Sequence, residues 1–202
     1  MKKIMFNDKY GLTTAVLEGR KTMTRRIVPD GTPLGNWSET VKHSKYQQGE
    51  VVAIAESYKT IYDRMETTAG NSKANAWWVE LANQSDRNPQ LLKGFKNKMF
   101  VKAEFMTNRI RIKDIRIERL QDISEEDVYR EGFRKEAINN GWGNAAWHWE
   151  AMLTYMDNLG RYKDIRSGKP KEAFSFLIDK ISGNGTWEDN PWVFVYEFEL
   201  IK

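Results

Sequence analysis

The stretch that decides the fold class is RIRIKDIRI, residues 109–117. Two isoleucines alternate with basic residues, and after Lys113 and Asp114 two more isoleucines continue the alternation one position out of phase. A period of two is typical of a strand with one buried face, and a β-bulge produces a phase slip of this kind. The stretch therefore predicts a bent strand whose isoleucines face a core.

Other segments carry strand or helix patterns of their own. Proline and glycine positions mark several of their ends. Strands and helices do not alternate regularly, which favours an α+β fold built on a small, mainly antiparallel β-barrel with short flanking helices. The further predicted strands are 20–28, 51–55, 99–106 and the segment from Pro191 to the end, and the predicted helices are 8–18, 124–132 and 170–183.

The length of 202 residues predicts a single domain. Two regions without a sustained period, at about 59–98 and 133–169, read as insertions into it. Charged residues make up 30% of the chain, but both signs are present and the formal net charge is only +4, which indicates a mildly basic globular protein.

Residue types that are rare or absent exclude several classes of function. There is no cysteine, so disulfide frameworks, zinc fingers and thiol nucleophiles are excluded and a reducing cytoplasm is expected. The two histidines, His43 and His148, lack a second ligand at metal-binding spacing, so we expect no metal and no cofactor. The N-terminus has no long apolar run, and no stretch could span a membrane, so no membrane association is expected.

The segment GRKTMTRR, residues 19–26, lies between a predicted helix and a predicted strand. It resembles the Gly-x-Lys-x-x-Thr-x-Arg signature of the ASCH domain, a family related to the PUA domain. Further stretches resemble the phage and prophage branch of that family: residues 51–56, residues 109–127 with the core IERLQDIS, and NPWVFV at 190–195. Together these stretches cover about half of the chain.

The resemblance implies a PUA-like barrel with a cleft for RNA or a modified nucleoside. One branch of the family hydrolyses the amide of N4-acetylcytidine with a Lys, a Thr and a Glu. The Lys matches Lys21 and the Thr matches Thr24, whereas Arg111 stands where the Glu is expected, so the hydrolytic chemistry does not carry over whole.

The candidate site is a basic cleft near the signature. Thr24 is a candidate nucleophile, Lys21 its base and Glu56, which follows a buried strand, an orienting acid; Glu56 could equally form a structural ion pair. Tryptophans of the two insertions, among them Trp77, Trp78, Trp142 and Trp147, could stack on bases. The expected ligand contacts are Lys21, Thr24, Arg25, Arg26, Arg109 and Arg111.

Three functions remain open at this point. The first is binding of RNA or a modified nucleoside through the basic cleft. The second is a small hydrolase, either an amidohydrolase on an acylated nucleoside or a ribonuclease, in which Arg111 would stabilise developing negative charge. The third is a phage-encoded module that binds a protein partner through its insertions.

Overall fold

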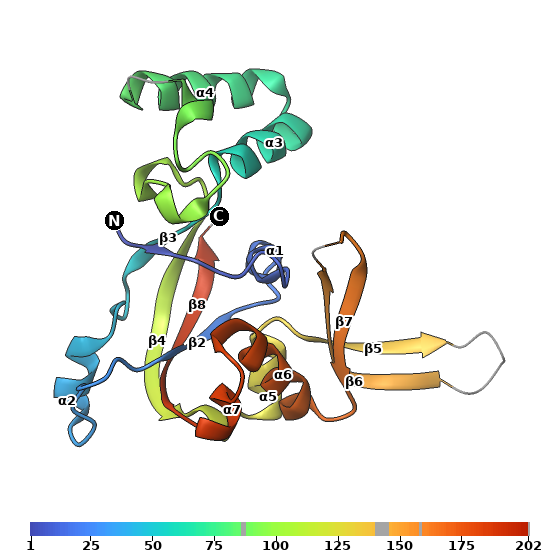
Figure 1. The fold of residues 1–202 in the computed structure, drawn as a ribbon. Helices are drawn as coiled ribbons and strands as arrows, with labels where there is room; N and C mark the ends of the chain where they lie inside the picture. The colour runs from blue at the N-terminus through green and yellow to red at the C-terminus, as the bar shows by residue number, and fades with distance from the viewer. Residues whose placement is uncertain (86–87, 140–145, 158, 202) are drawn as a thin grey trace. The chain divides into compact units, whose positions relative to one another are not determined.

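The computed structural model describes residues 1–85, 88–139, 146–157 and 159–201. Its strands form a five-stranded sheet in the order β1-β3-β4-β8-β2 and a three-stranded sheet in the order β5-β6-β7 (Figure 1). The predicted α+β class with mainly antiparallel pairing is confirmed. Within the described residues neither strand order closes on itself, so these residues form two open sheets and not the closed barrel that the sequence predicted.

The chain divides into two compact units. Unit 1 contains residues 1–6, 51–110 and 201–202, and unit 2 contains residues 7–50 and 111–200. None of the helices in the described part of the chain combines the length and the apolar composition that a membrane-spanning segment needs.

Unit 1 is built on a short parallel strand pair and a helical hairpin. β1 (Lys3–Ile4) pairs with β3 (Val51–Ile54), which confirms the predicted buried strand. The insertion predicted at 59–98 folds mainly as α3 (Tyr58–Ala69) and α4 (Asn71–Ser85), seen as the antiparallel pair in Figure 1. The side chain of Ser57 accepts a hydrogen bond from the Thr60 amide and so caps α3.

The prediction of a strand at 99–106 is wrong. This segment forms two short 3-10 helices, η3 (Lys98–Phe100) and η4 (Ala103–Phe105), and a third, η2 (Pro89–Leu91), precedes them. The side chain of Asn97 caps η3, while Val101 and Phe105 pack into the core beside α3 and α4. Packing against that core outweighed a strand propensity that depends strongly on context.

Unit 2 contains the central antiparallel strands. β2 (Met23–Ile27) pairs with β8 (Trp192–Ile201) from Met23 opposite Glu197 to Ile27 opposite Val193. β4 (Arg109–Arg119), most of which belongs to unit 2, is continuous, and its buried positions shift phase after Lys113, as the sequence predicted.

The helices of unit 2 begin and end close to the predicted positions. Ser124 caps α5 (Glu125–Arg130), and α6 (Pro170–Ser182) ends at Gly183. The first helix is shorter than the predicted 8–18, because residues 8–11 form a turn before α1 (Leu12–Leu17). The remaining helices are α2 (Trp37–Thr40), η1 (Val41–His43), η5 (Leu120–Asp122) and α7 (Thr186–Asp189).

The insertion predicted at 133–169 forms the three-stranded sheet. Its strands are β5 (Arg134–Asn139), β6 (Ala146–Met156) and β7 (Tyr162–Ser167), paired antiparallel in sequence order. Leu153 and Ile165 are buried, and α6 contacts both β6 and β7, so the insertion is packed onto the rest of unit 2.

Candidate functional site

The basic signature leads into a buried set of ion pairs in unit 2. Four cations and four carboxylates contact one another there, and they come from β2, β4, α5, β8 and the residues that flank β2 and α5. We refer to this group as the ionic cluster. Its members are Lys21, Arg25, Arg116, Arg130, Glu118, Asp127, Glu131 and Glu197.

Lys21 is the most deeply buried of these cations. Its side chain is 1% exposed and pairs with the carboxylate of Glu131, which is 6% exposed. The Lys21 Nζ also donates to the Glu131 carbonyl oxygen at 2.9 Å. Burial lowers the pKa of Lys21 and the charge of Glu131 opposes this shift. A general base must reach the proton that it abstracts. The Lys21 amine is instead paired with the buried carboxylate of Glu131.

Arg25 connects three carboxylates. Its Nε and Nη2 atoms donate to Glu118 Oε1 at 2.9 and 2.7 Å, and Nη2 also donates to Asp127 at 2.8 Å. Its Nη1 donates to Glu131 at 3.1 Å. Burial disfavours the guanidinium, but Glu131 and Glu118 outweigh burial and raise the pKa of Arg25. Arg25 therefore holds β2, β4 and α5 together, and with Arg26 and residues of α6 it also lines a cavity of about 280 Å³.

The outer edge of the ionic cluster is centred on Glu197. Arg130 Nη2 donates to Glu197 Oε2 at 2.7 Å, and Arg116 Nη1 donates to Glu197 Oε1 at 2.6 Å. These hydrogen bonds lower the pKa of Glu197, and the one from Arg130 has the largest effect. The four positive and four negative groups balance, so the cluster presents no net charge to a ligand.

The side chains of the signature divide between two faces of β2. Lys21 and Arg25 both reach Glu131 on one face of β2, whereas Thr24 and Arg26 alternate to the other face. Thr24 is buried opposite Tyr196 in the strand register. The alternation thus separates the candidate nucleophile Thr24 from the candidate base Lys21.

The face of β2 that carries Thr24 is aromatic. Tyr196 packs edge to face on Tyr46, with ring centroids 5.2 Å apart, and its hydroxyl lies 2.8 Å from Ser44 Oγ. Burial raises the pKa of Tyr46 to about 12, although Arg26 acts in the opposite direction. Thr24 therefore lies on a packed face of the sheet.

The other predicted contacts lie apart from the ionic cluster. Arg111 is 51% exposed, and Arg111 and Lys113 lie 3.6 and 3.5 Å from Glu199. Glu199 follows Glu197 by two positions, so Arg111 is on the same face of the sheet as the cluster, but it lines none of the cavities described here. Arg109 is exposed at the start of β4.

Glu56 belongs to unit 1 and has partners there. Its buried carboxylate pairs with Arg64, whose Nη2 donates at 3.0 Å, and accepts a hydrogen bond from Asn108 Nδ2 at 2.8 Å. These contacts fit the structural ion pair that the sequence left open. Glu56 thereby ties β3 to α3 and to the residue that precedes β4.

The tryptophans divide between the two units. Trp77 and Trp78 are partly buried against the core of unit 1. Trp142 and the side chains of Trp147 and His148 lie outside the described residues. Among the described residues no three His, Asp or Glu side chains are placed to hold a metal ion.

A cavity of about 460 Å³ lies in unit 2 beside the signature. Arg20 forms part of its wall and donates from Nη1 to the carbonyl oxygen of Gly132 at 3.1 Å. Gly132 directly follows Glu131. A Cβ atom added to Gly132 would lie 3.5 Å from the Cβ atom of Lys21, so the two residues are close neighbours. The Lys21–Glu131 pair of the ionic cluster therefore lies next to the wall that Arg20 and Gly132 form.

The remaining walls carry tyrosines and cations. Tyr10 and Tyr155 pack with ring centroids 5.0 Å apart, and Tyr162 is 75% exposed on β7. Burial raises the pKa of Tyr10, and Tyr155 adds to this shift. We refer to this site as the tyrosine cavity. Its lining includes Asp8, Lys9, Tyr10, Thr14, Arg20, Arg134, Met152, Thr154, Tyr155, Met156 and Tyr162.

Of these lining residues, the sequence pointed only to Arg20, through the signature. Arg134, Tyr155 and Tyr162 fall in a region without a usable period, so no pattern marked them as neighbours of residue 20. Comparison of the chain with protein-family models, with curated proteins and with solved structures finds no match.

Proposed function

We propose that this chain is an ASCH-like module that binds a nucleoside unit, free or within RNA, in the tyrosine cavity. The observation that carries the proposal is that Tyr10, Tyr155 and Tyr162 line the same cavity as Arg20 and Arg134, beside the signature segment. A PUA-like arrangement of the central strands belongs to the same proposal and rests on the resemblance of the signature.

The size and the aromatic lining suit a nucleobase. A cavity of about 460 Å³ falls within the range of roughly 300–1,000 Å³ typical of small-molecule sites. Every base has a π-face, and stacking on an aromatic side chain contributes about 1–3 kcal/mol. Tyr162, which is largely exposed at the cavity edge, offers such a surface.

The cations at the cavity suit the phosphates on either side of the bound nucleoside in RNA. Lys9, Arg20 and Arg134 line it together with one carboxylate, Asp8, and Arg20 is also paired with Glu18 beside the cavity, so cations exceed carboxylates by one among these five residues. Each phosphate contact releases condensed counterions, so affinity for RNA should fall steeply with salt, while affinity for an uncharged nucleoside should not.

The direct test is to titrate the chain with cytidine, N4-acetylcytidine and a short single-stranded RNA at two salt concentrations. We expect Tyr162→Ala to weaken all three ligands. Arg134→Ala should weaken RNA most and reduce the slope of log affinity against log salt by about 1. Lys42→Ala, which removes one exposed positive charge outside the cavity, is the matched control.

Two outcomes would overturn this assignment. Absence of binding by any of the three ligands at low salt would remove the nucleoside site. Equal losses in Arg134→Ala and Lys42→Ala would show that RNA is held by net charge and not by the tyrosine cavity. Release of acetate from N4-acetylcytidine would show that the chain hydrolyses this ligand and does not only bind it.

A further inference from the structure

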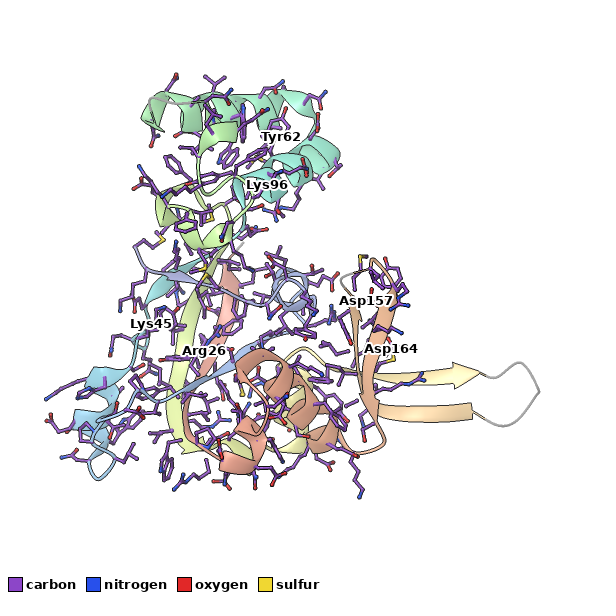
Figure 2. The ribbon with its side chains drawn as sticks, viewed as in Figure 1. Arg26, Lys45, Tyr62, Lys96, Asp157 and Asp164 are labelled. Atoms are coloured by element: carbon purple, nitrogen blue, oxygen red, sulfur yellow. The ribbon has the colours of Figure 1, made fainter. Side chains whose placement is uncertain are left out.

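A second cavity, of about 230 Å³, lies in unit 1 and is lined by three aromatic rings. Tyr62 comes from α3, on the side that faces α4 (Figure 2), and its hydroxyl donates to Asn75 Oδ1 of α4 at 2.9 Å. Trp78 comes from α4 and Phe95 from the segment that follows η2. We refer to it as the aromatic pocket; Lys59, Asp63 and Gln90 complete its lining.

The rings meet at steep angles. Tyr62 and Trp78 have centroids 5.1 Å apart and planes inclined by 61°, and Trp78 and Phe95 have centroids 5.8 Å apart and planes inclined by 61°. A base held between two rings needs them parallel, whereas inclined rings form the sides of a box around a compact group. The geometry therefore favours a rounded ligand over a flat one.

The polar part of the lining carries one charge of each sign. Asp63 carries a carboxylate, and Lys59 one helical turn earlier pairs with it while both side chains remain about half exposed. An exposed pair of this kind at i,i+4 is held only weakly. A ligand cation could therefore replace the Lys59 ammonium beside Asp63.

We propose that the aromatic pocket binds a methylated ammonium group of the kind carried by choline. The faces of Trp and Tyr rings attract such cations, and several rings around one quaternary ammonium are the usual arrangement for recognising it. The cavity is smaller than a typical drug-sized site, which fits a ligand group of a few heavy atoms. This site is independent of the tyrosine cavity and of the function proposed for it.

The test compares choline with 3,3-dimethylbutan-1-ol, which has the same shape without the positive charge. Ligand-observed NMR titration of the full chain measures both. We expect choline to bind about tenfold more tightly, because an attraction of about 1–2 kcal/mol between ring faces and a cation is lost in the neutral compound. Equal binding of the two, or no binding of choline, would overturn the proposal.

Exposed positions supply variants that should not disturb folding. Asp63→Asn should weaken choline, and Lys59→Gln should strengthen it because the competing ammonium is gone. Glu66→Gln removes an exposed carboxylate of α3 that does not line the aromatic pocket and serves as the control for Asp63→Asn. The same loss in both acidic variants would contradict a specific site, and tighter binding of adenosine than of choline would replace it by a base-stacking site.

Discussion

Lys21 and Glu131, which are 110 positions apart in the sequence, form an ion pair with almost no exposure to solvent. The pair connects the basic signature to the end of α5. Arg25 reaches the same carboxylate, so Glu131 compensates two buried cations at once. Charges taken out of water are costly unless paired and hydrogen-bonded, so the Glu131 carboxylate is needed to compensate both buried cations.

Glu131→Gln should therefore be strongly destabilising. Removal of one partner of a buried pair leaves an uncompensated charge and typically costs about 3–5 kcal/mol. Denaturant unfolding monitored by circular dichroism measures the change. Glu199→Gln is the control, because Glu199 pairs with Arg111 and Lys113 at the surface and should lose less than about 1 kcal/mol. Similar losses in the two variants would show that burial of the Lys21 pair carries no special weight.

The ionic cluster should also make stability depend on pH on the acid side. Arg130 and Arg116 hold the pKa of Glu197 below its usual value of 4.5. A carboxylate with a lowered pKa contributes stability that is complete above the pKa of the unfolded chain and is lost as pH falls through the folded value. Unfolding free energies measured from neutral pH to below 4.5 should fall less steeply in Glu197→Gln than in the natural chain.

Glu126→Gln provides the comparison for that experiment. Glu126 is exposed on α5 and is not a member of the ionic cluster, so this variant should keep the natural pH profile. A Glu197→Gln profile that coincides with that of Glu126→Gln would contradict the assigned role of Glu197.

Tyr46 should ionise at a higher pH than an ordinary phenol. Its pKa of about 12 reflects burial beside Tyr196, and such a raised value means that its stability contribution is present below the usual value of 10.0 and is lost as pH rises through about 12. Spectrophotometric titration of tyrosine should show a late component that disappears in Tyr46→Phe. If that component persists unchanged in the variant, Tyr46 is not its source.

Gly94 should tolerate no side chain. An added Cβ would lie 2.6 Å from Cε2 of the buried Tyr58 ring, closer than real contacts allow, and the Gly94 carbonyl already accepts the Tyr58 amide. Gly94→Ala should therefore cost about 1–3 kcal/mol by overpacking. Gly35→Ala, where an added Cβ meets no atom within 4 Å, should unfold at nearly the natural denaturant concentration. Equal midpoints for the two variants would contradict the packing at Tyr58.

Local rules accounted for several of the elements in unit 2, but not for the three strands of the insertion at 133–169. The phase slip after Lys113, the Ser124 cap and the bounds of α6 at Pro170 and Gly183 all depend on residues within a few positions of one another. The same rules failed at residues 99–106, where Val101 and Phe105 are buried by the helical hairpin that precedes them in the sequence. The alternation of apolar residues at 99–106 carries no information about the helical hairpin against which they pack.

The candidate site was less accessible to such rules. A cationic segment at 19–26 is visible in the sequence, but alternation sends Lys21 and Thr24 to opposite faces, and the partner of Lys21 directly follows α5, 110 positions away. Glu131 carries no local signal, since one acid among several near α5 gains its importance only from Lys21 and Arg25. The tyrosine cavity likewise depends on where β6 and β7 pass beside Arg20.

The amino-acid sequence by itself determined part of the strands and helices, among them β4, α5 and α6, and where the basic residues are concentrated, because these properties follow from neighbours along the chain. Only the tertiary structure decided that Lys21 and Arg25 form ion pairs with buried carboxylates and that Arg20 lines a cavity together with Tyr155 and Tyr162. The physical reason is that the energy of a charge depends on its solvation and on partners brought close by the path of the whole chain.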